Sequence, residues 1–168
     1  MTSTPLGKKA GLLLDTNLLV LYIIGCYDPK RITKHKRTHT YTPEDFDLLL
    51  NFMGQFKQFV TTPNILTETS NLLEGDSYQY GSVLSMLPEL IQNFIELYEP
   101  SHSVMSSRNK IFVKFGLSDA VSCIMTEQNY LILTDDLKLC YFLQNNSFDA
   151  LNFNNLRSDY LLQRRIQA

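Results

Sequence analysis

Cysteine is scarce in this chain of 168 residues: there are three, Cys26, Cys123 and Cys140, and no two of them form a CxxC pair. An odd, widely spaced set argues against a disulfide framework and fits a reducing compartment. We therefore expect a cytoplasmic protein. Cys26 with His35 and His39 could supply part of a zinc site. Such a site would lack its fourth ligand.

Glycine-rich phosphate-binding motifs are also absent. Neither GxxxxGKS/T nor GxGxxG occurs, so nucleotide-dependent chemistry is not expected. The three histidines, His35, His39 and His102, fall in segments that we expect to be loops, and no Ser-His-Asp or Cys-His pairing is evident. The formal net charge is only −2. Any nucleic-acid binding must therefore come from a local basic patch.

A membrane-spanning segment is missing too, although residues 11–26 are almost wholly apolar. Asp15 lies near the middle of this run, and an acidic residue at the centre of a membrane helix costs about 2.5–3.5 kcal/mol on insertion scales. No small-residue cleavage site follows Cys26, so a signal peptide is not expected either. We predict no membrane association.

The remaining pattern is typical of a single α/β domain covering residues 1–168. Strands are predicted at residues 11–14, 59–62, 130–134 and 148–153. Helices are predicted at 17–24, 42–57, 63–75, 78–97 with a bend at Pro88, 106–115, 118–129 and 135–146, followed by a short terminal helix. Residues 25–41 are expected to be a loop or insertion. The alternation of strands and helices predicts a mostly parallel sheet flanked by helices.

Acidic residues occur at informative places in this order. Asp15 follows the first strand, and Asp135 and Asp136 follow the strand at 130–134. Glu68 lies at the edge of the apolar stripe of its helix, and Asp119 lies in the first turn of another helix. Each has an ordinary explanation, as a helix cap, a turn residue, a surface residue or a partner of the helix dipole.

Taken together, these acids indicate a metal site. Carboxyl ends of parallel strands share one edge of the sheet, and two of the helices could close over that edge. Carboxylates brought together repel one another, and a divalent cation removes that penalty. Oxygen ligands suit Mg²⁺ or Mn²⁺.

The ordered motifs LLLDTNLL, NILTETSNLL, GLSDAVSC and LILTDDLKL resemble those of the PIN-domain nucleases over residues 11–153. The resemblance implies a three-layer α/β/α fold. It also implies that the metal-binding and catalytic acids are Asp15, Glu68, Asp119 and Asp136. It implies further that the acids are supported by Asn17, Thr134 and Asp135. Which of the two adjacent aspartates, Asp135 or Asp136, reaches the metal stays open.

The same resemblance implies metal-dependent hydrolysis of phosphodiester bonds, with RNA as the expected substrate. Small members of the family are ribonuclease toxins held inactive by an antitoxin, so an antitoxin or regulatory protein, or a second copy of the chain, are expected as partners. Two alternatives stay open. One is a catalytically silent binding module or scaffold in a larger complex, and the other is a metal phosphohydrolase that acts on small molecules.

A basic segment without acidic residues lies between residues 30 and 39. It belongs to the stretch at residues 25–57, which looks longer than in compact family members because it holds this basic cluster and an extra helix. We expect its cations to contact the phosphate backbone of a nucleic acid; they are Lys30, Arg31, Lys34, Lys36 and Arg37. Tyr27 and Tyr41 flank the segment and could stack on unpaired bases. The alternative is a solvated surface loop.

Overall fold

The apolar run that begins at Gly11 forms the central strand of the sheet. In the computed structural model, which describes residues 9–73 and 83–166, β1 (Gly11–Leu14) pairs in parallel with β2 (Phe59–Thr61) on one side and β4 (Tyr130–Thr134) on the other. Leu12, Leu13 and Leu14 are at most 1% exposed. Because helices cover both faces of the sheet, the strand is apolar at every position instead of alternating.

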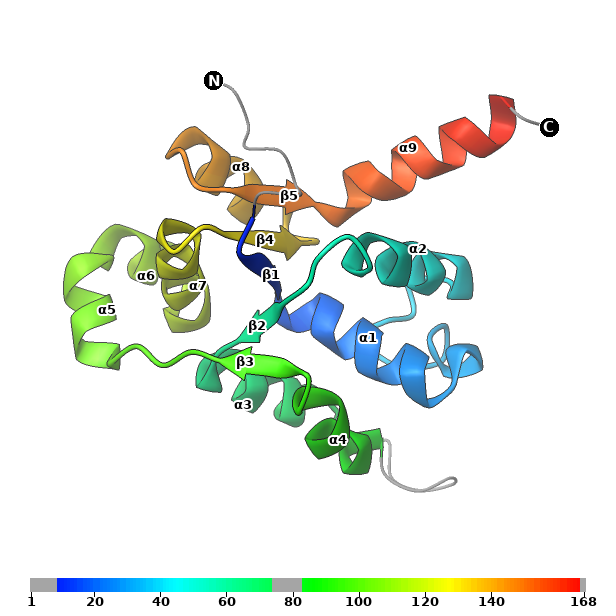
Figure 1. The fold of residues 1–168 in the computed structure, drawn as a ribbon, viewed down its shortest axis with the longest axis horizontal. Helices are drawn as coiled ribbons and strands as arrows, with labels where there is room; N and C mark the ends of the chain where they lie inside the picture. The colour runs from blue at the N-terminus through cyan, green and yellow to red at the C-terminus, as the bar shows by residue number, and fades with distance from the viewer. Residues whose placement is uncertain (1–8, 74–82, 167–168) are drawn as a thin grey trace.

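Two edge strands complete a five-stranded parallel sheet. β3 (Phe94–Glu96) pairs with β2, and β5 (Ala150–Asn152) pairs with β4, which gives the order β3-β2-β1-β4-β5. Figure 1 shows α1 (Thr16–Tyr27) and α2 (Pro43–Met53) on one side of the sheet. The helices on the other side are α5 (Ser101–Ser107), α6 (Asn109–Phe115) and α7 (Leu117–Glu127). The predicted three-layer α/β/α arrangement is confirmed.

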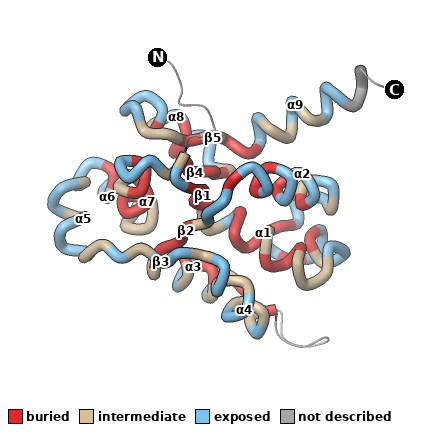
Figure 2. Tube along the Cα trace, in the orientation of Figure 1, coloured by how far each residue is buried: buried red, intermediate tan, exposed pale blue. Residues whose placement is uncertain are grey.

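The remaining helices surround this centre. α3 (Pro63–Leu73) packs beside α1, and α8 (Leu137–Asn145) packs on β4 and β5. The short helices are α4 (Leu87–Ile91) and the 3-10 turns η2 (Pro29–Arg31) and η3 (Val83–Met86). α9 (Phe153–Ile166) begins directly after β5 and extends away from the body of the domain. Figure 2 shows burial concentrated in β1, β4 and the neighbouring part of α1, and largely lost along α9.

The strand order contains one switch point. From β1 the chain moves to β2 and β3 on one side, and it then returns to place β4 and β5 on the other side. The crossover connections therefore diverge between β1 and β4. In open parallel sheets this divergence leaves a crevice outside the carboxyl ends of the two strands, where ligands bind. The residues that follow β1 and β4 are Asp15 and Asp135.

Close packing of α1 against α2 depends on a glycine inside α1. A Cβ atom built on Gly25 would lie 2.3 Å from Cδ2 of Phe46, so a larger residue would have to displace the Phe46 ring that packs there. The predicted first helix, residues 17–24, is too short, because α1 continues through Gly25 to Tyr27.

The prediction of one helix over residues 78–97 is wrong for the part that the structure describes. Only Leu87–Ile91 is α-helical there, and Phe94–Glu96 is the edge strand β3. Residues 78–82 lie outside the described residues. The edge strand carries no run of buried apolar residues, because Ile95 and Glu96 are exposed. It therefore lacked the signal that revealed β1.

Two smaller predictions also need correction. His102, expected in a loop, lies in α5, which begins before the predicted helix at 106–115. The terminal helix is not short, since α9 has 14 residues. None of the helices in the described residues combines the length and the apolar character needed to cross a membrane.

Candidate active site at the carboxyl ends of β1 and β4

Asp15 joins the ends of β1 and β4. Its backbone N–H donates to the carbonyl of Leu133 (3.0 Å), and its Oδ2 accepts a hydrogen bond from the backbone N–H of Asp135 (3.0 Å). Its Oδ1 accepts from the N–H of Leu18 (2.9 Å), which caps the start of α1. The ordinary explanation of Asp15 as a helix cap is thus confirmed, and the same carboxylate also fixes the turn after β4.

Burial makes ionisation of Asp15 unfavourable. Desolvation, followed by the negative charge of Asp135, raises the pKa of Asp15 to about 8. The opposing hydrogen bonds come from the Thr134 hydroxyl and from two backbone N–H groups, and no basic side chain in the described ranges is among them. A carboxylate in this position is stabilised by dipoles alone. An added cation would favour its ionised form.

Asp135 is the acid that faces Asp15. Its Oδ1 accepts from Nδ2 of Asn17 (3.1 Å), and its Oδ2 accepts from the hydroxyl of Tyr41 (2.5 Å). Burial, followed by the charge of Asp135, raises the pKa of Tyr41, so this hydroxyl remains a proton donor. Tyr41 is only 3% exposed. The prediction that Tyr41 stacks on unpaired bases is therefore wrong.

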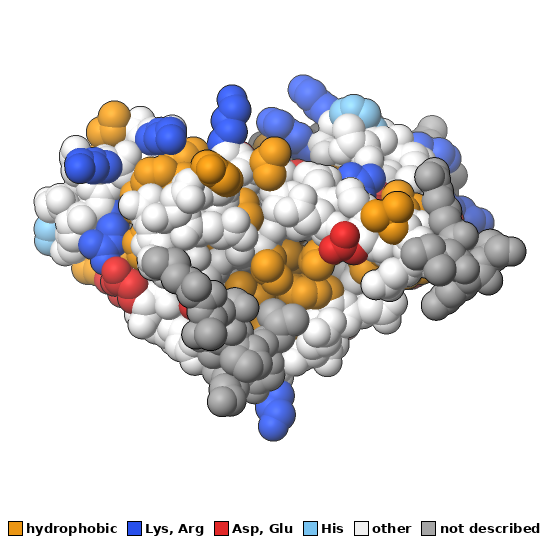
Figure 3. All heavy atoms as spheres, turned by 90° about the horizontal axis from the view of Figure 1, so that it is seen from above, with side chains coloured by type: hydrophobic (Ala, Val, Ile, Leu, Met, Phe, Trp, Pro, Cys, Tyr) orange, Lys and Arg blue, Asp and Glu red, His pale blue; other side chains and the backbone are white. Residues whose placement is uncertain are grey.

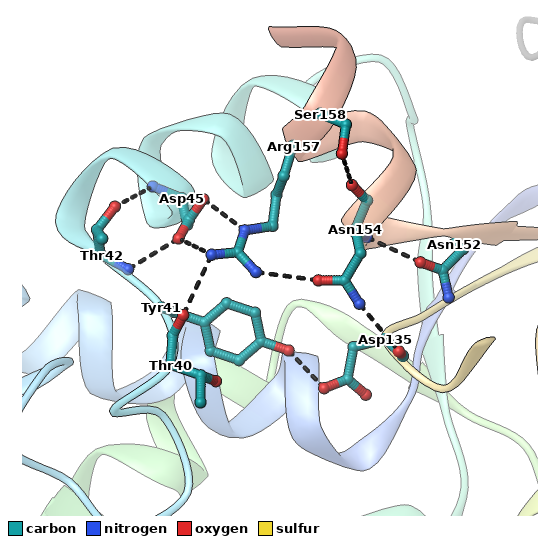
Figure 4. Close-up of polar contacts among 9 residues, drawn as sticks. All are labelled: Thr40, Tyr41, Thr42, Asp45, Asp135, Asn152, Asn154, Arg157 and Ser158. Atoms are coloured by element: carbon teal, nitrogen blue, oxygen red, sulfur yellow. Dashed lines mark hydrogen bonds and ion pairs between the residues drawn. The ribbon is translucent and has the colours of Figure 1, made fainter. Parts of the chain in front are cut away.

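Arg157 of α9 closes over this arrangement, as Figure 4 shows. Its guanidinium binds both oxygens of Asp45 (2.7 and 2.8 Å) and donates to the carbonyl of Thr40 (3.1 Å). It also lies 5.1 Å from the centre of the Tyr41 ring. Three separate elements, α2, α9 and the segment before α2, are held together around the tyrosine that contacts Asp135.

Asn154 connects the same arginine to the turn after β4. Its Oδ1 accepts from Nη1 of Arg157 (2.9 Å), and its Nδ2 donates to the carbonyl of Asp135 (3.1 Å). The sequence pattern pointed to neither Arg157 nor Asn154. Both lie near the start of the terminal helix, far along the chain from Tyr41 and Asp45, and no local motif marks them.

Glu68, Asp119 and Asp136 form a second acidic group. Burial, then the charges of Glu68 and Asp136, raises the pKa of Asp119 to about 7. Glu68 is exposed, and its Oε2 accepts from the hydroxyl of Thr16 (2.8 Å), the residue after Asp15. Through Thr16 the second group lies next to the first.

Asp136 also serves as a helix cap. Its Oδ1 accepts from the N–H groups of Lys138 (2.7 Å) and Leu139 (3.0 Å) at the start of α8. Its own N–H donates to Oγ1 of Thr134 (3.0 Å), the hydroxyl that also bonds to Asp15. Thr134 is fully buried. Its hydroxyl therefore contacts both acid residues from one position.

The predicted acids lie in one region, as a facing pair (Asp15 and Asp135) and a trio in electrostatic reach (Glu68, Asp119 and Asp136). In residues 9–73 and 83–166, however, no three His, Cys, Asp or Glu side chains are close enough to hold a metal ion together. The same finding covers the candidate zinc ligands Cys26, His35 and His39.

The basic segment is an ordered turn with its cations outside. Ile32, His35 and Thr38 are buried, and the Thr38 hydroxyl donates to the carbonyl of Ile32 (2.7 Å). The exposed cations are Lys30, Lys34, Lys36 and Arg37. Arg31 is half-buried and lies over the Tyr27 ring at 5.2 Å. On the face drawn in Figure 3, Lys and Arg side chains lie mainly along one edge and few acidic side chains are visible.

Comparisons with known proteins do not identify this chain. No model of a protein family matches it. Searches of curated proteins and of solved structures also gave no match. What the site does must therefore be inferred from its own residues.

Proposed function

We propose that this chain is a metal-dependent endonuclease that hydrolyses phosphodiester bonds, with RNA as its substrate and the cytoplasm as its location. The observation that carries the proposal is the pair of half-buried acids with raised pKa values, Asp15 and Asp119, beside the switch point of a parallel sheet. Perturbed acids in a crevice of this kind are typical of functional sites. The preference for RNA comes from the resemblance to PIN-domain nucleases.

The donor set fits a hard divalent cation in its chemistry. Carboxylates are the ligands that Mg²⁺ and Mn²⁺ prefer, and the residues that would hold an ion are Asp15, Glu68, Asp119 and one of Asp135 and Asp136. A carboxylate has about four acceptor positions, so Asp15 retains capacity beside its hydrogen bonds. Glu68 is exposed, and its Oε2 accepts a hydrogen bond from Thr16. Rotation of this flexible side chain can turn the carboxylate from Thr16 toward Asp119.

A bound divalent ion would neutralise charge on the scissile phosphate and favour ionisation of the attacking water. The residues of this chain supply position and charge. Asn17 and Tyr41 hold the Asp135 carboxylate, and Thr134 holds Asp15 and the backbone of Asp136. The exposed cations of the basic segment supply sequence-independent contacts to phosphates.

A second candidate function is supported by the helix caps. Asp15 and Asp136 both stabilise helix starts, so these acids would also be kept in a binding module without catalysis. The two proposals differ in one property, because only the enzyme requires that the carboxylate charge of Asp15 act on a metal.

Cleavage of a mixed panel of RNA and single-stranded DNA by the full chain tests the choice. We expect cleavage with Mg²⁺ or Mn²⁺, none with EDTA, and none for Asp15→Asn, in which the amide keeps the size and loses the charge. Asp28→Asn is the matched control, because Asp28 caps η2 through the N–H of Lys30 (3.0 Å), outside the acidic groups. Full activity of Asp15→Asn in saturating metal would rule out the enzyme as proposed.

A further inference from the structure

A cleft of about 420 Å³ lies beside the acidic site, between α3 and the junction of α6 and α7. Asn64, Thr67 and Asn71 line its α3 wall. Their spacing of three and four residues places them on one face of that helix. Phe115 and Leu117 line the opposite wall. The two walls therefore differ in chemistry: the α3 wall is mainly polar and carries Glu68 beside its neutral groups, and the opposite wall is mainly apolar.

The end of the cleft at the helix junction is open. Gly116 lies between α6 and α7 and has a φ of 95°. This left-handed conformation favours glycine. A Cβ atom built on Gly116 would meet no other atom within 4 Å. The turn thus leaves open space at Gly116 itself, and its chain neighbour Phe115 is half-buried.

Glu68 connects the cleft to the acids. It lines the cleft, accepts a hydrogen bond from Thr16, and raises the pKa of Asp119. Asp119 itself follows Ser118, another residue of the cleft wall. A molecule in the cleft would therefore lie directly beside the carboxylates.

The lining determines which part of a nucleic acid can enter. Of the described residues that line the cleft, Glu68 alone is charged, and its negative charge would repel a phosphate. A nucleobase is uncharged, with apolar faces and a hydrogen-bonding edge. Aromatic rings bind such faces by stacking, and asparagine offers both a donor and an acceptor for the edge. The volume of the cleft is at the lower end of the range for small-ligand sites. It therefore suits one base and not a nucleic-acid helix.

Lys114 lies near the Phe115 ring and could contact the phosphate backbone of a bound nucleic-acid strand. Nζ of Lys114 lies 4.8 Å from the centre of the Phe115 ring, and Lys114 is exposed. Phe142 packs against Phe115, with the two ring centres 5.1 Å apart, and the same Lys114 Nζ lies 4.9 Å from the centre of the Phe142 ring. Phe142 therefore helps to hold the Phe115 ring, which is half-buried and lines the cleft.

We propose that this cleft binds one unpaired nucleobase of a single-stranded nucleic acid, next to the phosphate that reaches the acids. The inference rests on the proposed nuclease function and deepens it. Asn64 and Asn71 contact the base edge, and Phe115 stacks on its face. Bases paired inside a duplex cannot enter, so the substrate is single-stranded at this position.

Binding of short RNA by the full-length Asp15→Asn protein in Mg²⁺ provides the test. The probes are fluorescein-labelled 8-nucleotide single strands, intact or with one abasic position moved along the strand. We expect one abasic position to weaken binding about tenfold, which corresponds to about 1.4 kcal/mol. Adding Asn64→Ala and Asn71→Ala should weaken binding of the intact strand by a similar factor, and it should remove the penalty of that abasic position.

Asn51→Ala is the matched control, because Asn51 is an exposed asparagine on α2, away from the cleft. Phe115→Leu is a second variant that removes the stacking surface and retains an apolar residue against Phe142. Melting temperatures of all variants are compared first. If the double variant binds intact and abasic strands as the Asn51→Ala control does, the cleft is not a base site.

The outcomes separate the inference from the proposed function. Cleavage by the wild type with no effect of the cleft variants would overturn the base site and leave the nuclease. Base-dependent binding through the cleft without any cleavage would support the base site and overturn the nuclease. Absence of both binding and cleavage would overturn both.

Discussion

Arg157 offers the sharpest test of how the site is assembled. Replacing it with Gln keeps much of its length and removes the charge that holds Asp45. The substitution breaks four hydrogen bonds, two to Asp45 and one each to the Thr40 carbonyl and Asn154. It also removes the cation from the Tyr41 ring, so the tyrosine that contacts Asp135 loses a packing partner.

The burial of the ion pair sets the expected magnitude. The side chains of Arg157 and Asp45 are 25% and 13% exposed. Exposed pairs contribute about 0–1 kcal/mol, while removing one partner of a fully buried pair costs about 3–5 kcal/mol. For this intermediate case we expect Arg157→Gln to lower the free energy of unfolding by about 2–3 kcal/mol. In a chain of this size that corresponds to a melting temperature lower by about 5–10 °C.

Denaturant unfolding and thermal melting measure this change. Arg108→Gln is the matched control, since Arg108, between α5 and α6, pairs with Glu127 of α7, which is 49% exposed. These three helices lie on the other side of the sheet from α2. It should cost no more than about 1 kcal/mol. A double-mutant cycle with Asp45→Asn should give a coupling energy of about 1–2 kcal/mol. Equal losses for the two arginine variants, or a coupling energy near zero, would refute the assignment of Arg157 as a clamp.

Further expectations concern the acids and the basic segment. The pKa of Asp15 is about 8 in the folded chain and 3.8 ordinarily. Its contribution to stability is therefore complete below pH 3.8 and is lost as the pH rises through 8. Melting temperatures at pH 5 and pH 9 should differ less in Asp15→Asn than in the wild type. Mg²⁺ or Mn²⁺ should raise the melting temperature by mass action, and more at pH 8 than at pH 5, since protons compete for the same carboxylates; a melting curve indifferent to metal at both pH values would contradict a metal site. Tyr41→Phe removes one hydrogen bond to a charged acceptor and should cost about 1.5–3 kcal/mol, with apparent metal affinity also lowered; an unchanged stability would show that the hydroxyl is not needed. Replacing Lys34, Lys36 and Arg37 by Ala in an Asp15→Asn background should reduce the logarithmic salt dependence of single-strand binding by about 0.7 per lost phosphate contact, whereas a solvated loop predicts equal slopes.

Local pattern was sufficient for the elements that build the switch point. Two apolar segments, residues 11–14 and residues 130–134, predict the strands β1 and β4. Each strand is buried on both faces and is therefore largely apolar. Thr42 and Pro43 predict the start of α2, and the structure has a capping box between Thr42 and Asp45 there. The sequence alone therefore predicts that the acids after these strands lie at one edge of the sheet.

Local pattern failed where a segment's state depends on distant partners. Phe94–Glu96 is a strand only because β2 offers an edge for pairing, and its exposed residues give no strand signal. The adjacent acids at 135 and 136 look alike in sequence. The fold separates them, because Asp135 turns inward to Asn17 and Tyr41 while Asp136 caps α8.

The sequence by itself determined the parallel α/β class, the position of the acids at strand ends and the presence of an outward basic segment, because burial, helix capping and charge act over a few neighbouring residues. The tertiary structure alone decided that Tyr41 and Arg157 hold the site and that the carboxylates divide into a pair and a trio. It also decided that a cleft lined by Glu68 and by neutral residues lies beside the acidic site. Those features depend on contacts between side chains about 50 to 120 positions apart, and contacts at such separations leave no periodic trace in the chain.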